Sequence, residues 1–273
     1  PPFVTIPAVM ETLGECKCIG VGAQDVSDRD NGAFTGEIST TMLNELGCKY
    51  VVLGHSERRQ YHGETNAYIN KKIKKALAAG ICPIYCIGET LEQRQGGELE
   101  TVLKSQVVEG LEGLTAEEVG GLVIAYEPVW AIGTGKTATN DDIVETHAIC
   151  RDLMREIMQK IASEKGKDLR VYIIGDKIVA CMLRSNDSDF RANYSLGAKA
   201  ELVDLPEEGE KYLKVVIYDL HPDFIGVDFL IDNGQYVFNE VEDPVGSRML
   251  YENTDIDPIK LFAEHVLNVM GVQ

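Results

Sequence analysis

The chain has 273 residues, of which 44% are hydrophobic, and this suits one large α/β domain or two smaller ones with a buried core. Its formal charge of −18 disfavours nucleic acids and anionic membranes as partners, because both bind clustered lysine and arginine. No apolar run approaches membrane-spanning length, and no basic segment precedes an apolar one near residue 1, so we expect neither anchor nor export signal and a cytoplasmic location.

The first part of the chain alternates strand-like and helix-like segments. Continuous apolar runs at residues 18–23, 50–54, 82–88 and 121–126 predict buried strands. Apolar residues at helical spacing predict helices near residues 69–77 and 102–111, and Asn140 is a helix-capping residue before a third. The strands recur roughly every 30 to 40 residues, which predicts βα units and a parallel sheet.

Chemically useful side chains follow these strands. His55 and Glu57 come after the second strand, and Glu127 ends the fourth, ahead of a loop that contains Gly133 and Gly135. Function in parallel βα folds collects at this edge of the sheet, so Glu127 is a candidate general base and His55 a candidate electrophile. Glu57 is placed to contact substrate or an arginine. The alternatives are that Glu127 merely caps a helix and that His55 is structural.

Residues after about 166 follow an antiparallel pattern. Two strand pairs are predicted at 169–174 with 178–183 and at 225–231 with 235–241, and helices at 206–219 and 258–270. We therefore predict two domains, residues 1–160 and 161–273, without a shift in charge between them. A three-residue loop at 232–234 would put Asp228 and Glu240 on one face of the hairpin, whereas a two-residue Asn-Gly turn would put them on opposite faces.

Three motifs of the first part resemble triosephosphate isomerase: G-H-S-E-R-R at 54–59, C-I-G-E-T at 86–90 and A-Y-E-P-V-W-A-I-G-T-G-K at 125–136. The resemblance covers residues 1 to about 155 and also takes in G-A-F-T-G-E at 32–37. It implies isomerisation of a small phosphorylated sugar without a cofactor, in glycolysis and gluconeogenesis. Glu127 would be the base and His55 the neutral electrophile. Gly133 would donate its amide to phosphate, and the loop around Thr35 would reach a second subunit.

The resemblance begins near the family's second strand. The catalytic asparagine and lysine of the family's first strand have no counterpart here, nor do the glycine turns after its seventh and eighth strands, so we expect impaired activity. Four βα units of a (βα)8 TIM-barrel would also leave two open sheet edges, through which we expect a homo-oligomer to form.

The second part resembles the C-terminal part of ATP-grasp carboxylate–amine ligases, through D-L-R-V-Y-I-I-G-D-K at 168–177, D-F-R-A-N at 189–193, G-V-D-F-L at 226–230 and N-E-V-E at 239–242. The resemblance implies magnesium ligation by Asp228 and Glu240, with Glu242 in place of an asparagine, and phosphate or substrate contacts from Arg170 and Arg191. Magnesium and ATP are therefore the expected cofactors of this half. The alternative is that these acids lie on a solvated sheet face.

The expected architecture is thus a partial TIM-barrel of about four βα units followed by an α+β ATP-grasp-like half. Two other functions stay open, a magnesium- and ATP-binding ligase remnant and a non-catalytic fusion or assembly protein. Residues 169–175 resemble the isomerase's seventh strand in pattern, so a fusion at similar strands predicts that they run parallel to residues 121–126.

The chain has seven cysteines. Most lie in apolar runs, which is typical of reduced core residues, and neither the C-x-C nor the C-x3-C spacing has a partnering pair of histidines. We therefore expect no zinc site.

Overall fold

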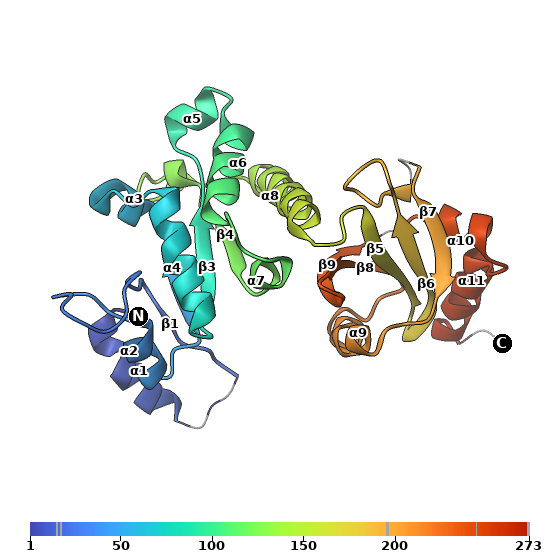
Figure 1. Ribbon diagram of the computed structural model, residues 1–273, viewed down its shortest axis with the longest axis horizontal. Coiled ribbons are helices and arrows are strands. Elements are labelled where there is room, and N and C mark those ends of the chain that lie inside the picture. The colour runs from blue at the N-terminus through green and yellow to red at the C-terminus, as the bar shows by residue number, and fades with distance from the viewer. Residues whose placement is uncertain (15, 17, 195–196, 244, 272–273) are drawn as a thin grey trace. The chain divides into compact units, whose positions relative to one another are not determined.

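The computed structural model describes residues 1–14, 16, 18–194, 197–243 and 245–271. The chain divides into two compact units, Pro1–Leu114 with Gly121–Met154, and Thr115–Gly120 with Arg155–Gln273. The first contains a four-stranded parallel sheet and the second a five-stranded antiparallel sheet (Figure 1). No helix of the described residues is long and apolar enough to cross a membrane.

The parallel sheet has the order β1-β2-β3-β4, formed by β1 (Gly22–Ala23), β2 (Tyr50–Leu53), β3 (Cys82–Ile87) and β4 (Val123–Tyr126). Val51, Leu53 and Tyr85 are fully buried on the face that the helices cover. Tyr50 and Val123, whose side chains alternate to the other face, are exposed. The described residues therefore form part of a TIM-barrel sheet and not a closed barrel, as the sequence predicts.

The helices of the first unit follow the predicted βα alternation. They are η1 (Phe3–Thr5), α1 (Ile6–Leu13), α2 (Thr40–Glu45), α3 (Ser56–His62), α4 (Asn66–Ala78), α5 (Leu91–Gln95), α6 (Leu99–Gly110), η2 (Val129–Ala131) and the start of α8 (Asn140–Ile161). The predicted helices near 69–77 and 102–111 are confirmed as α4 and α6. Both pack on β3 through buried apolar residues such as Ile73 and Val107. Thr65 caps α4 by accepting the Tyr68 amide.

The first predicted strand is much shorter than expected. Only Gly22 and Ala23 of residues 18–23 pair with β2, and the Ile19 side chain is exposed. An apolar run at the sheet edge has too few neighbours to bury it, so the pattern overstated this strand.

The antiparallel sheet has the order β7-β6-β5-β8-β9. Its strands are β5 (Lys167–Ile174), β6 (Lys177–Ser185), β7 (Lys199–Val203), β8 (Phe224–Asp232) and β9 (Gln235–Glu242), and its helices are α7 (Ala116–Gly120), the end of α8, α9 (Glu207–Leu220), α10 (Arg248–Asn253) and α11 (Pro258–Val269). The two predicted hairpins and both predicted helices are confirmed. β5 is antiparallel to both its neighbours, β6 and β8, so the prediction that residues 169–175 continue the parallel sheet is wrong.

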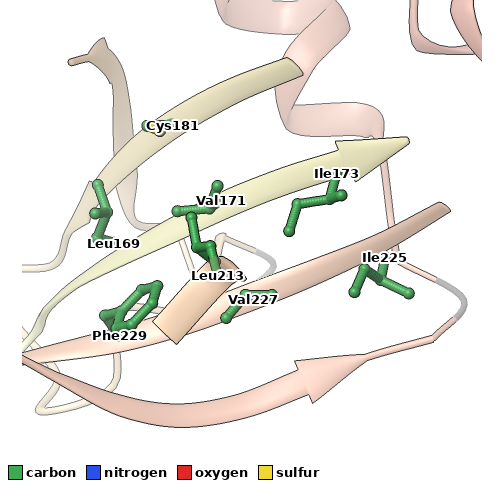
Figure 2. Close-up of a cluster of buried hydrophobic side chains, with 8 residues drawn as sticks. All are labelled: Leu169, Val171, Ile173, Cys181, Leu213, Ile225, Val227 and Phe229. Atoms are coloured by element: carbon green, nitrogen blue, oxygen red, sulfur yellow. The ribbon is translucent and has the colours of Figure 1, made fainter. Parts of the chain in front are cut away.

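Each face of this sheet has its own core. Alternate residues of β5, β6 and β8 pack with Leu213 of α9 (Figure 2): Leu169, Val171, Ile173, Cys181, Ile225, Val227 and Phe229. On the other face Tyr172 and Met182 pack with Met249 and Leu250 of α10. The strand pattern of period two thus buries both faces under helices.

Candidate active site

The carboxyl ends of β2 and β4 bring His55 and Glu127 together. His55 is the N-cap residue of α3, and Glu127 follows the last residue of β4. His55 Nε2 lies 3.3 Å from Glu127 Oε2, and the two side chains are 34% and 15% exposed. Two groups predicted from separate strand ends therefore face each other at the sheet edge and still reach solvent.

The orientation of the His55 ring follows from a backbone hydrogen bond. The Glu57 amide donates to His55 Nδ1 at 3.3 Å, so the neutral ring carries its proton on Nε2. That N–H points to the Glu127 carboxylate. Glu57 itself is 67% exposed, with Oε2 3.8 Å from His55 Nδ1, so its amide orients the ring while its carboxylate faces largely into solvent.

Glu127 is held in place by its backbone and by Ser56. Its amide donates to the Ile87 carbonyl at 2.8 Å, and its carboxylate accepts from the Ser56 amide at 2.6 Å and from Ser56 Oγ at 3.2 Å. Ser56 was not predicted as a site residue, although it follows His55 directly. A side chain on Gly88 would place its Cβ 1.8 Å from the Glu127 carbonyl oxygen, so this close approach of β3 and β4 requires glycine.

The loop after Glu127 is anchored at its start by a buried acid. Glu89 is fully buried, and its Oε1 accepts from Trp130 Nε1 at 2.9 Å, Tyr126 OH at 3.0 Å and Arg94 NH1 at 3.1 Å. Burial raises the pKa of Tyr126 to about 12, so this phenol stays a donor. Glu89 was not predicted either, although it lies in the C-I-G-E-T motif.

The glycines of the same loop have left-handed backbone angles. Gly133 has φ 66° and Gly135 has φ 75°, a region that other residues rarely adopt. A Cβ added at either position would meet no atom within 4 Å, so a ligand can approach this backbone closely. The loop therefore combines a fixed start with an open glycine segment.

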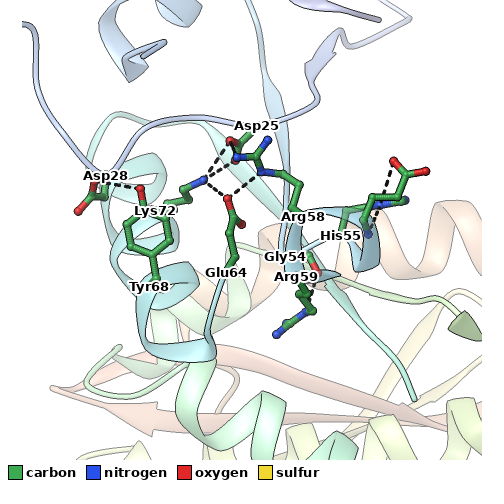
Figure 3. Close-up of polar contacts among 10 residues, drawn as sticks. Asp25, Asp28, Gly54, His55, Arg58, Arg59, Glu64, Tyr68 and Lys72 are labelled. Carbon is green, nitrogen blue, oxygen red and sulfur yellow. Dashed lines mark hydrogen bonds and ion pairs between the residues drawn. The ribbon is translucent and has the colours of Figure 1, made fainter. Parts of the chain in front are cut away.

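A group of four charges, two of them buried, supports the helix α3 that His55 caps (Figure 3). Lys72 Nζ lies 2.8 Å from Asp25 and 2.6 Å from Glu64, and Arg58 contacts the same two acids at 2.9 and 2.7 Å. Burial raises the pKa of Asp25 despite these cations. Burial also opposes ionisation of Glu64, but its bonds to Lys72 and Arg58 outweigh this and lower its pKa. The two cations balance the two acids and join the end of β1 to α3 and α4.

In the second unit a β-bulge decides the position of the predicted metal ligands. Asp232 pairs with Gln235, so the turn is the two-residue type, and both Asn233 and Gly234 have positive φ. The register then shifts between Asp228 and Phe229, so Asp228 lies directly opposite Glu240. The two acids thus share one face by a route that the turn alone would have excluded.

Each of these acids is already paired with arginine. Asp228 accepts from Arg170 Nε and NH2 and from Arg184 NH2, each at 2.7 Å, and is only 2% exposed. Arg170 also pairs with Glu242, and Arg155 pairs with Glu240. Burial opposes ionisation of Asp228, but the two guanidinium groups hold its pKa below the usual value.

Asp168 extends this network across β5 and β6. Both its oxygens accept from Arg184, at 2.5 and 2.6 Å, and burial raises its pKa to about 6 despite that bond. Two aspartates and two arginines therefore form a buried network on one face of the sheet, and Arg170 links it to Glu242. We call Asp168, Arg170, Arg184 and Asp228 the buried quartet.

The predicted magnesium ligands are brought together but do not fit a metal ion as they stand. No group of three or more metal-ligating side chains occurs in the part of the chain that the structure describes. Arg191 does not join Arg170, because its bonds are to Asp189, at 2.7 to 3.0 Å, and it stacks near Phe190. Magnesium ligation and the phosphate role of these arginines stay predictions.

Comparison with known proteins agrees with both resemblances. The triosephosphate isomerase family model matches residues 1–171, and the RimK-like ATP-grasp domain model matches residues 137–266. The triosephosphate isomerase of Carboxydothermus hydrogenoformans is 50% identical over 175 residues, 62% of this chain and 69% of that protein. Those of Chloroherpeton thalassium and Protochlamydia amoebophila are 49% and 45% identical, over 68% and 62% of their lengths and 64% and 60% of this chain. The chain thus spans about two thirds of the length of these relatives.

Proposed function

Because the chain belongs to the triosephosphate isomerase family over residues 1–171, we propose that its first unit interconverts glyceraldehyde 3-phosphate and dihydroxyacetone phosphate. The observation that carries this proposal is the 3.3 Å approach of His55 Nε2 to Glu127 Oε2 at the carboxyl ends of β2 and β4, on either side of β3. A base and a hydrogen-bond donor that converge on one point are what proton transfer next to a carbonyl requires.

In the proposed reaction Glu127 removes a proton from the carbon beside the substrate carbonyl. The electron pair moves onto the carbonyl oxygen, which becomes the oxygen of an enediolate, and His55 Nε2–H donates to it. His55 gives its Nε2 proton to that oxygen and takes the hydroxyl proton from the neighbouring oxygen, and Glu127 returns the carbon-bound proton to the adjacent carbon, which completes the isomerisation. In the free protein Ser56 and His55 bind the carboxylate, so substrate has to replace these bonds before Glu127 can act.

The loop at Gly133 is proposed to bind the substrate phosphate through its backbone amide. This rests on its left-handed backbone and on the open space around it. With a chain charge of −18, an anionic substrate needs such local donors. The anchored Trp130 gives the loop a fixed hinge from which it can close.

The test is a coupled triose-phosphate assay on the purified full chain with Glu127→Asp, Glu127→Gln and His55→Gln. Loss of a positioned base or acid is expected to lower kcat by about 10²- to 10⁴-fold. Glu100→Gln, on the exposed face of α6, is the matched control and should leave turnover unchanged. Turnover that is absent in the parent chain, or equal in the parent and Glu127→Gln, would contradict the proposal.

A second candidate function is nucleotide binding with magnesium by the second unit. It is supported by the RimK-like match and by the register that sets Asp228 opposite Glu240. Arginine pairs on these acids would have to open first, so we expect weak binding. Titration with Mn²⁺ and ATP, followed by electron paramagnetic resonance, tests this: saturable binding that Glu240→Gln abolishes supports it, and no binding at millimolar Mn²⁺ contradicts it.

We further propose that the first unit self-associates. β1 and β4 are edge strands of the parallel sheet in the described residues. Val123 in β4, and Tyr50 in β2 next to β1, have exposed side chains. The loop around Thr35 is also exposed, with Phe34 43% accessible. Light scattering should give a mass above the 30.1 kDa of one chain, and a monomer at micromolar concentration would refute the proposal.

A further inference from the structure

Two cysteines differ from the others in exposure and spacing. Cys16 and Cys18 are both exposed, and their sulfur atoms lie 2.8 Å apart. Of the other five, Cys48, Cys86, Cys150 and Cys181 are buried and Cys82 is half-buried. The expectation that most cysteines are core residues therefore agrees with the other five, and Cys16 and Cys18 are the exceptions.

The surroundings of the pair favour a reactive thiolate. The Cys18 thiol and the backbone amides of Cys18 and Ile19 lower the pKa of Cys16. Burial raises the pKa of the Cys48 and Cys82 thiols, and raises those of Cys86, Cys150 and Cys181 to about 12, 11 and 11. Since the thiolate is the nucleophile, exchange should start at Cys16.

The position of the pair is compatible with a bond between its sulfurs. The Cys16 amide donates to the Leu13 carbonyl at 3.0 Å, which ties this residue to the end of α1. The sulfur atoms, 2.8 Å apart, need only a small movement to reach the length of a disulfide, about 2.05 Å. Because the cysteines are two positions apart, the second thiol is always near the first.

We propose that Cys16 and Cys18 form a reversible disulfide by exchange with a small disulfide such as glutathione disulfide. The Cys16 thiolate attacks one sulfur of that disulfide, forming a mixed disulfide and releasing one glutathione thiolate. Cys18, after losing its proton to solvent, attacks the Cys16 sulfur and releases the second glutathione. Two electrons pass from the cysteine pair to glutathione disulfide, and an excess of reduced glutathione reverses both steps.

Metal binding is the weaker interpretation of the same pair. A structural zinc site needs four ligands, and no group of three or more ligating side chains exists among the residues that the structure describes. A two-thiol site with both sulfurs exposed is better suited to exchange with another disulfide.

The experiment equilibrates the reduced full chain with mixtures of reduced and oxidised glutathione at pH 7. The chain is then unfolded in denaturant with iodoacetamide, so that every free thiol is alkylated, and its peptides are mapped by mass spectrometry. We expect a Cys16–Cys18 disulfide under conditions where the other five cysteines are still alkylated. Cys16 should react with glutathione disulfide at least about tenfold faster than buried Cys48 does. Reduced glutathione should restore both thiols.

Single variants separate the two steps. Cys18→Ser removes the second nucleophile, so a mixed disulfide of glutathione should accumulate on Cys16. In Cys16→Ser the remaining Cys18 thiol should react with glutathione disulfide more slowly than Cys16 does in the parent chain. Cys82→Ser, at a half-buried position, should behave like the parent chain. The proposal is overturned if Cys16 and Cys18 stay alkylated to the same extent as Cys48, if the disulfide joins other cysteines, or if Cys18→Ser accumulates no mixed disulfide.

Discussion

Replacing Asp228 by asparagine tests whether the buried quartet stabilises the second unit. The carboxylate accepts three hydrogen bonds from Arg170 and Arg184, and it is 2% exposed. The substitution removes the acid that both arginines share, and leaves Arg184 with Asp168 and Arg170 with half-buried Glu242. Removing one partner of a buried ion pair costs about 3–5 kcal/mol. Since whole domains are stable by about 5–15 kcal/mol, the second unit should become marginal.

The single tryptophan allows this loss to be assigned to one unit. Trp130 lies in the first unit, so its fluorescence reports unfolding there, while far-ultraviolet circular dichroism reports both units. In urea, the unfolding midpoint of the second unit, measured by circular dichroism, should fall by about 2 M. The midpoint measured by Trp130 fluorescence should not change. Asp255→Asn, at an exposed position, is the matched control. A decrease of less than about 0.5 kcal/mol in the free energy of unfolding of the second unit in Asp228→Asn would refute the claim that the quartet stabilises this unit.

Three further predictions follow from single contacts. Burial raises the pKa of Asp168 from 3.8 to about 6, so between these pH values the folded state binds more protons than the unfolded state. The free energy of unfolding should therefore fall as pH rises from 4 to 6. Asp168→Asn should remove that part of the pH dependence of urea unfolding. Gly88→Ala places a Cβ 1.8 Å from the Glu127 carbonyl oxygen, so it should destabilise the first unit by more than about 2 kcal/mol. Urea unfolding followed by Trp130 fluorescence measures this. An unchanged unfolding midpoint would contradict the close approach of Gly88 to Glu127. Trp130→Phe removes one hydrogen-bond donor from buried Glu89. Limited proteolysis should then cut the loop that contains Gly133 faster than in the parent chain. Equal cleavage rates would argue against the proposal that Glu89 anchors this loop through Trp130.

The sequence predicts those parts of the fold whose pattern is local. Strands β2, β3 and β4 are continuous apolar runs with helices between them, and parallel strands place His55 and Glu127 at the same sheet edge. The second hairpin is equally local, because Asn233-Gly234 specifies a two-residue turn.

Features that depend on distant residues were not predicted. β7 has mostly exposed side chains and little apolar alternation, so its sequence carries no strand pattern. The bulge that sets Asp228 opposite Glu240 cannot be inferred from the turn. Arg184 pairs with Asp168 and Asp228 only because β6, β5 and β8 are neighbours in the sheet, so the quartet became visible only from strand order.

The central claim is that Glu127 and His55 form a working proton-transfer pair. Its most direct measurement is exchange of the carbon-bound hydrogens of dihydroxyacetone phosphate with deuterium oxide, followed by proton nuclear magnetic resonance, because exchange reports proton removal even when isomerisation is slow. We predict exchange with the full chain, reduced about 10²- to 10⁴-fold in Glu127→Gln and unchanged in Glu100→Gln. Exchange at the rate of buffer alone, or equal exchange in the parent chain and Glu127→Gln, would contradict the claim.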